Sequence, residues 1–227
     1  MRFMTLAEAA THFRGKRVAI VGGGPSVLNN APGWIDSFDI VVRMNNYRTG
    51  PAQGFRCDAF YSYFGNCIHK TVDELKRDGV KLCMVKVPNA KPIESAWHER
   101  LGKQHGIDFR WIFALRKDFW FCPTYVPTVE RFVEQFNLLE KHIPTTGFSA
   151  ILDVLACEPA CCYLTGYDMF SSRLHNVNEP WRPGDPSDPI GHRPDLEARW
   201  LGANAKRYLL MLDPVVAQVI AENRAAA

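Results

Sequence analysis

The stretch RVAIVGGGPSVLNN, residues 17–30, decides the fold. Its first six residues, RVAIVG, form an apolar run typical of a buried strand, and the glycines, proline and serine that follow predict a sharp turn. Glycine lets the backbone of such a turn approach a phosphate closely, because it carries no side chain. The stretch therefore predicts a strand that leads either into a phosphate-binding turn or into a tight strand–helix turn without a ligand.

The rest of the chain alternates between strand-like and helix-like segments. The further predicted strands are residues 38–45, 57–64, 80–87 and 160–168, and the predicted helices include 71–79, 127–142, 146–158 and 195–213. Strands that alternate with helices form a parallel sheet with right-handed crossovers. Residues 171–194 are dense in proline, glycine, asparagine and aspartate, which predicts a long loop that is a mobile lid, a binding loop or a disordered segment. We therefore expect a single Rossmann-like α/β domain over residues 1–227.

Length, charge and cysteine content narrow the classes of function. The 227 residues carry a net charge of +3, which suits an anionic small ligand but is too dispersed for a nucleic-acid surface. No apolar run approaches the roughly 20 residues of a membrane span, so we expect a cytoplasmic protein, with the membrane surface as an alternative location. The seven cysteines form no C-x-x-C pair, which argues against zinc and predicts free thiols.

The glycine turn departs from the two common nucleotide-binding motifs. A dinucleotide-binding turn needs a third glycine where this chain has Val27, and Pro25 removes one backbone N–H from the turn. The acidic residue expected about 20 residues later is replaced by RMNN, and no Gly-Lys-Ser/Thr of a P-loop is present. The sequence therefore disfavours NAD and P-loop ATP chemistry.

Two further segments place polar groups where α/β sheets bind ligands. In RMNNYRT, residues 43–49, two asparagines end a predicted strand, where they can hydrogen-bond a base or ribose or simply form a turn. In HIPTTGFSA, residues 142–150, threonines and a glycine open a predicted helix, whose free N–H groups favour an anion. Capping of this helix by Thr145 or Thr146 is the alternative interpretation.

The segment GHRPDLEARW, residues 191–200, supplies a candidate base. His192 lies between the long loop and the last predicted helix, and imidazole is suited to remove a proton from a sugar hydroxyl. Glu197, five residues later, either orients the imidazole or lies on a solvated helix face. A purely structural histidine is the alternative.

Taken together and in order, these segments resemble the sialyltransferases, both the animal family with its four sialylmotifs and the smaller bacterial family. VAIVGGGPSVLNN and FDIVVRMNNYRT resemble the large motif, and PTTGFSAILDVLACEPACCYLTGYD resembles the small motif. His175 lies where the third motif falls, and HRPDLE is similar to the His-x-x-x-x-Glu of the last motif. The four motifs together cover about half of the chain.

The resemblance implies a Rossmann-like fold of the glycosyltransferase type and a donor that is a CMP-activated acidic sugar, sialic acid or Kdo. It implies transfer to a glycan or glycolipid hydroxyl with inversion, without a metal and without a cofactor. By position in the motifs, His192 would be the general base and His175 would contact the phosphate. The expected donor-binding residues are Gly22, Gly23, Gly24, Ser26, Asn45, Thr146, Gly147 and Asp168.

The chain departs from the family pattern at several positions. Gly23 stands where the first turn usually has an asparagine, and Asn176 and Val177 replace the aromatic residues of the third motif. Val18 stands at the cysteine of the large motif, so the inter-motif disulfide of the animal enzymes should be missing. Two other functions stay open. One is a metal-dependent nucleotide enzyme similar to pterin pyrophosphokinases or flagellin-modification proteins, and the other is a nucleotide-binding module without catalysis.

Overall fold

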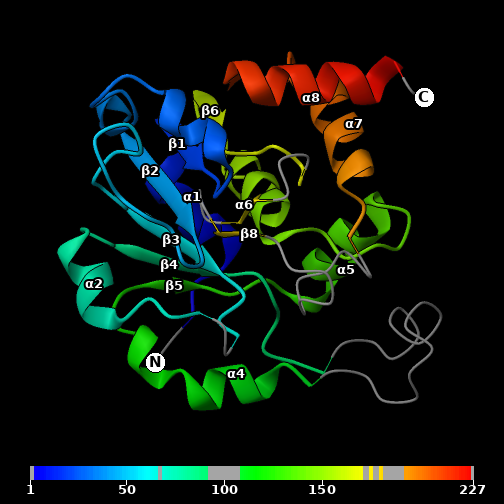
Figure 1. The fold of residues 1–227 in the computed structure, drawn as a ribbon. Coiled ribbons are helices and arrows are strands. Elements are labelled where there is room, and N and C mark those ends of the chain that lie inside the picture. The colour runs from blue at the N-terminus through cyan, green and yellow to red at the C-terminus, as the bar shows by residue number, and fades with distance from the viewer. Residues whose placement is uncertain are drawn as a thin grey trace.

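The structure is a computed structural model that describes residues 3–65, 68–91, 108–170, 174–175, 179–180 and 192–225. Its centre is a seven-stranded parallel sheet with the strand order β5-β4-β3-β2-β1-β6-β9 (Figure 1). The strands are β1 (Arg17–Val21), β2 (Ile40–Met44), β3 (Ala59–Ser62), β4 (Leu82–Val85), β5 (Thr124–Tyr125), β6 (Cys161–Thr165) and β9 (Leu210–Leu212). This architecture confirms the predicted Rossmann-like α/β domain.

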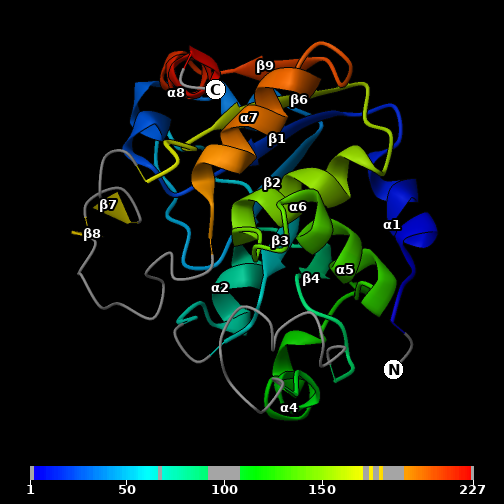
Figure 2. The ribbon, with the colours of Figure 1, turned by 90° about the vertical axis from the view of Figure 1, so that its right-hand side faces the viewer.

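Helices cover both faces of the sheet (Figure 2). One face carries α1 (Leu6–Phe13), α6 (Thr146–Leu155) and α7 (Pro194–Asn204). The helix α5 (Val129–Leu138) is hydrogen-bonded to α6, and its Phe132 packs in the cluster of the opposite face. The other face carries η1 (Pro25–Asn29), η2 (Ile35–Ser37), α2 (Val72–Arg77), α4 (Arg110–Leu115) and η3 (Lys117–Phe119). Strand side chains alternate between the two layers, so Val18 and Ile20 pack with α6, whereas Ala19 and Val21 pack on the opposite face.

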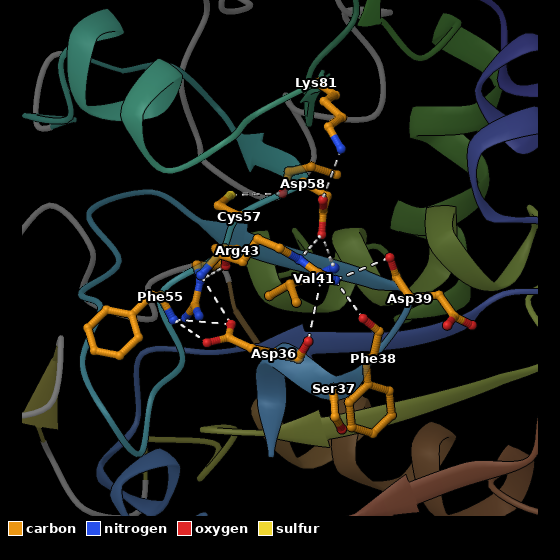
Figure 3. A network of polar contacts seen from close by, with 12 residues as sticks. Asp36, Ser37, Phe38, Asp39, Val41, Arg43, Phe55, Cys57, Asp58 and Lys81 are labelled. Atoms are coloured by element: carbon orange, nitrogen blue, oxygen red, sulfur yellow. Dashed lines mark hydrogen bonds and ion pairs between the residues drawn. The ribbon is translucent and has the colours of Figure 1, made fainter. Parts of the chain in front are cut away.

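Figure 3 shows the polar network that holds the loop between β2 and β3 against the sheet. The Asp58 carboxylate accepts hydrogen bonds from the Val41 amide and the Arg56 side chain, both at 2.9 Å. The Asp36 carboxylate accepts the amide of Phe55 at 2.8 Å and that of Arg56 at 3.1 Å. The network fixes the returning half of a loop that starts at the carboxyl end of β2.

Arg43 supports the same loop from within the core, where it is fully buried. Its Nε donates to the carbonyl of Arg56 at 2.8 Å, and its Nη2 donates to the carbonyl of Gln53 at 2.6 Å. Burial lowers the pKa of Arg43. The arginine of the RMNN stretch therefore holds the chain that surrounds the neighbouring asparagines.

The C-terminal region differs from the predicted single helix over residues 195–213. Helix α7 ends at Asn204, Leu209 takes a positive φ of 49°, and β9 then pairs with β6. The helix α8 (Pro214–Ala225) follows and packs against α7 and β9. A short apolar run such as LLML, residues 209–212, suits a strand as well as a helix face, and pairing with β6 supplies its backbone with hydrogen-bond partners.

Other predictions from the sequence have clear outcomes in the described residues. The six described cysteines, Cys57, Cys83, Cys122, Cys157, Cys161 and Cys162, carry free thiols. None of the helices in the described ranges combines the length and apolar character needed to cross a membrane. Within the predicted lid, β7 (Leu174–His175) and β8 (Glu179–Pro180) form a short antiparallel pair, and the rest of residues 171–191 lies outside the description.

Asp153 links one layer of helices to the sheet. This residue of α6 is fully buried, and its carboxylate accepts hydrogen bonds from the Tyr61 hydroxyl at 2.7 Å and the Gln135 amide at 2.7 Å. Arg131 donates a third through Nε at 3.0 Å. Burial raises the pKa of Asp153, and the Arg131 charge opposes that rise. One carboxylate therefore ties β3, α5 and α6 together.

We expect Asp153→Ala to lower the free energy of unfolding by about 3–5 kcal/mol, because buried donors lose their acceptor. Glu134→Ala is the matched control, since Glu134 also pairs with Arg131 but is 68% exposed. That variant should lose less than about 1 kcal/mol. Urea denaturation of both variants measures the difference, and equal losses would contradict the linking role of Asp153.

Candidate functional site

The candidate site lies at the carboxyl edge of the sheet, where the parallel strands end. Sheets of this type bind ligands at that edge, near the point where the strand order reverses. Here the order reverses between β1 and β6. The glycine turn follows β1, Asn45 follows β2, and Asp168 follows β6, so the topology brings three of the predicted segments to one edge.

Two of the predicted glycines pack against the turn after β6. The Gly22 amide donates to the Thr165 carbonyl, and the Gly24 amide donates to the Gly166 carbonyl, both at 2.8 Å. A Cβ at Gly22 would overlap the Gly166 carbonyl oxygen, and a Cβ at Gly24 would lie 2.8 Å from it. Gly23 between them is half-buried. Gly22 and Gly24 therefore allow two turns of the protein to meet, a use that the sequence did not reveal.

The hydroxyl of Ser26 is engaged within the protein. It donates to Oδ2 of Asp213 at 2.7 Å, and the Gly166 amide donates to both Ser26 Oγ and Asp213 Oδ2 at 3.1 Å. Ser26 and Asp213 are buried. Asp168 lies beside the glycine turn, with Oδ1 3.2 Å from where a Cβ of Gly24 would be. Ser26 thus joins the turn after β1 to the residue that precedes α8.

Asn45 presents free donors at the end of β2. Its φ of 48° lies in the left-handed region, which asparagine tolerates better than most residues. Its side-chain oxygen accepts the Ser62 hydroxyl at 3.0 Å. The side-chain nitrogen has no hydrogen-bond partner within the described part of the chain, so its two N–H groups are available to a ligand. The neighbouring Asn46 accepts the His69 amide at 2.7 Å.

The start of α6 carries two further predicted residues. Thr145 is the N-cap, since its hydroxyl oxygen accepts the Phe148 amide at 3.0 Å. Thr146 and Gly147 are the first helical residues, and amides at these positions have no acceptor within the helix. A Cβ at Gly147 would lie 2.6 Å from the ring of Tyr167, so glycine lets this ring pack beside the helix. The helix start therefore combines free donors with the positive end of its dipole.

Glu197 of α7 is buried and binds the start of α6. Its carboxylate accepts the Thr145 amide at 2.6 Å and the Thr145 hydroxyl at 2.8 Å. Burial raises the pKa of Glu197 to about 7, and the two hydrogen bonds from Thr145 oppose that rise. Of the two alternatives considered for Glu197, the solvated position on a helix face is therefore wrong. The carboxylate joins α7 to α6, and its partners are groups of Thr145.

His192 is held by a backbone carbonyl just before α6. Its Nδ1 lies 2.6 Å from the carbonyl oxygen of Ile143. A carbonyl only accepts, so Nδ1 carries the proton and Nε2 is the ring nitrogen that can accept one. Burial, together with the nearby Lys86 charge, lowers the pKa of His192 to about 4. The ring is therefore neutral at neutral pH, with its single proton on Nδ1. The backbone of His175 lies in β7, and its side chain is outside the description.

Lys86 also belongs to this site, and the sequence did not single it out. It follows β4 directly, is only 8% exposed, and donates through Nζ to the Pro144 carbonyl at 2.6 Å. Burial lowers the pKa of Lys86 to about 8. The only signal in the sequence is a lysine within the otherwise apolar end of the predicted strand 80–87.

We expect Thr145→Ala to cost more stability than the loss of an ordinary helix cap. Thr128→Ala is the matched control, because Thr128 caps α5 through the Arg131 amide. The control should lose about 1 kcal/mol. Thr145→Ala should lose about 1–3 kcal/mol more, since a buried oxygen of Glu197 also loses its donor. Urea denaturation measures both, and equal losses would show that the Glu197 contact adds nothing.

Comparisons with known proteins give a match in structure alone. No protein-family model matches the sequence, and no curated protein matches it. A mammalian sialyltransferase aligns with a TM-score of 0.55 and 17% identity over 87% of this chain and 68% of its own. The alpha-2,3-sialyltransferase Cst-I of Campylobacter jejuni aligns with a TM-score of 0.59 and 17% identity, over 88% and 76% of the chains. The sialyltransferase CstII of the same organism, in complex with CMP-3FNeuAc, aligns with a TM-score of 0.57 and 16% identity. This alignment covers 87% of this chain and 81% of its own. The chain therefore has the fold of the sialyltransferases.

Proposed function

We propose that this protein is an inverting glycosyltransferase that moves an acidic sugar, sialic acid or a Kdo-like sugar, from a CMP-sugar to a hydroxyl of a glycan or glycolipid. The observation that carries the proposal is His192. Its Nδ1 is bound to the Ile143 carbonyl, and its Nε2 is the proton acceptor beside the start of α6. A base close to an anion-binding helix start suits transfer from a sugar that is linked to phosphate.

In the proposed reaction, Nε2 of His192 takes the proton of the acceptor hydroxyl while the hydroxyl oxygen forms a bond to the anomeric carbon. The bond between this carbon and the phosphate oxygen of CMP breaks, and its electron pair stays on the phosphate. Attack from the face opposite to CMP inverts the anomeric centre. The products are the glycoside, CMP and a protonated His192, which then returns its proton to solvent.

The donor side of the proposed site uses the free amides at the carboxyl edge. The N–H groups of Thr146 and Gly147, with the dipole of α6, stabilise the negative charge that develops on the leaving phosphate. The free side-chain nitrogen of Asn45 donates to the cytosine or the ribose. His175 is the proposed second contact to the phosphate. The turn from Gly22 to Ser26 contributes through its backbone, because the Ser26 hydroxyl is bound to Asp213.

The proposed reaction needs no metal and no further cofactor. CMP carries a single phosphate and is already a good leaving group, so the chemistry does not demand a cation bridging two phosphates. The amides at the start of α6 and the dipole of this helix supply favourable electrostatics for a departing phosphate monoester.

We expect CMP to raise the melting temperature more than UDP, GDP, ATP or NAD, with EDTA present throughout. Binding to the folded state alone stabilises it, by about 2.7 kcal/mol at a ligand concentration of 100 times Kd. Asn45→Ala should reduce the CMP shift, because the variant lacks the proposed donor to the nucleoside. Thermal shift assays measure the panel. Equal stabilisation by another nucleotide, or a nucleotide shift that appears only when magnesium replaces EDTA, would favour the pyrophosphokinase-like alternative.

We expect His192→Ala to lower kcat for sugar transfer by about 10²–10⁴-fold, the usual contribution of a general base. CMP affinity should hardly change, because the base contacts the acceptor. In the parent, kcat/KM should fall only as pH approaches a pKa of about 4, well below the ordinary 6.5 of histidine. Transfer assays in EDTA and calorimetric titration with CMP separate the two quantities.

His12→Ala in α1 is the control for the loss of a histidine as such, and it should keep parental rates. Parental turnover in His192→Ala would exclude His192 as the base. Tight CMP binding by the parent without transfer to any acceptor would favour a nucleotide-binding module instead.

A further inference from the structure

Three consecutive residues ahead of α6 are each held by a side chain from elsewhere in the chain. The Ile143 carbonyl accepts Nδ1–H of His192 at 2.6 Å, and the Pro144 carbonyl accepts Nζ of Lys86 at 2.6 Å. Thr145 donates its amide to Glu197 at 2.6 Å. Residues 143–145 are called the hinge segment below. The lysine that follows β4, the histidine that precedes α7 and a glutamate of α7 therefore converge on one short piece of backbone.

The position of Lys86 is costly for stability alone. It is 8% exposed, and no carboxylate lies within ion-pair distance of it among the described residues. A buried ammonium group without a paired anion loses solvation that one carbonyl oxygen only partly replaces. An apolar side chain would fill the same space more cheaply. The lysine therefore has a use other than packing.

We propose that Lys86 is a positioning residue for His192, an inference that rests on the proposed function. The ammonium group holds the Pro144 carbonyl and so fixes the adjoining Ile143 peptide. The Ile143 carbonyl then keeps the proton on Nδ1 and leaves Nε2 free for the acceptor hydroxyl. In addition, the positive charge of Lys86 opposes a second proton on the imidazole.

The ionisation states around the hinge segment agree with this role. Burial and then the Lys86 charge lower the pKa of His192 to about 4. Burial lowers the pKa of Lys86 itself to about 8, and the charge of Glu197 opposes that change. Lys86 is therefore mostly protonated at neutral pH while His192 is neutral. The other ionisable groups near the cluster are Tyr167 after β6, whose pKa burial raises, and Asp195 in α7.

Three substitutions separate the two parts of the proposed role. Lys86→Arg keeps the charge and a donor, Lys86→Gln keeps a donor without charge, and Lys86→Met keeps neither. NMR titration of labelled histidine side chains, with the His192 signals identified by their loss in His192→Gln, reports both pKa and tautomer. Neither measurement needs a substrate.

In the parent and in Lys86→Arg, His192 should be the Nδ1–H tautomer with a pKa well below its ordinary value. In Lys86→Gln and Lys86→Met, its pKa should rise by roughly one unit, the size expected when a nearby like charge is removed. Lys81→Met is the matched control. Lys81 precedes the same strand, its side chain is 77% exposed, and it pairs with Asp58. This variant should leave the titration of His192 unchanged.

Transfer assays add a readout that a merely structural lysine would not move. In Lys86→Met, the acidic limb of kcat/KM should move to higher pH by the same roughly one unit. The KM for the CMP-sugar should stay near the parental value, and Lys86→Arg should restore the profile.

Identical His192 titration in the parent, Lys86→Gln and Lys86→Met would overturn the proposal. So would an Nε2–H tautomer in the parent, which decides the question even if every neutral variant fails to fold. A parent that shows the expected titration but transfers no sugar would refute the proposed function and leave the role of Lys86 toward His192 intact.

Discussion

The contact between the two glycine turns at the carboxyl edge is the constraint on which the rest of the structure depends. The backbone after β1 touches the backbone after β6 at Gly22 and Gly166, with no side chain between them. The two central strands can therefore stay paired to their last residues, Val21 and Thr165. Through Ser26, the same contact anchors Asp213 and with it the start of α8. Because β2 pairs in parallel with β1, the end of β2 lies at the same edge of the sheet.

Much of the fold could be predicted because the decisive signals are local. The apolar runs at residues 17–22 and 160–168 have the composition of buried parallel strands, and both form neighbouring strands of the sheet. The error at residues 195–213 has a physical cause. Periodicity over a short apolar run does not distinguish a helix face from a strand at the end of a sheet, and only the free side of β6 decides between them.

The types of residue in the candidate site could be predicted from the sequence, but most of the contacts that these residues make could not. The glycines at positions 22 and 24 were identified, but their packing against Gly166 depends on a turn more than a hundred residues away in the chain. The two roles considered for Glu197 both assumed neighbours in its own segment, whereas its partner is Thr145. Lys86 carries no motif at all. Burial is a property of the assembled fold, so the unusual ionisation of these groups could not be inferred from spacing.

Charge in the site is controlled by burial more than by ion pairing. Solvent exclusion keeps His192 neutral, reduces the basicity of Lys86 and brings Glu197 into the neutral range of pH. Each of the three is hydrogen-bonded to a backbone group or a hydroxyl of the hinge segment, and the opposite charges of Lys86 and Glu197 attract each other without forming an ion pair. Such groups respond strongly to small changes in solvent access, because the desolvation that shifts them is not balanced by a close counter-ion.

The three contacts of the hinge segment also determine when the site can form during folding. They join residues that are 49, 58 and 52 positions apart in the chain. Closing loops of this length costs entropy, and none of the three contacts can form before the segments that carry both partners have docked. A chain that has folded only as far as α6 has the helix start but neither the histidine nor the glutamate that complete it. The site is therefore complete only in the fully folded domain, after α7 has docked against α6.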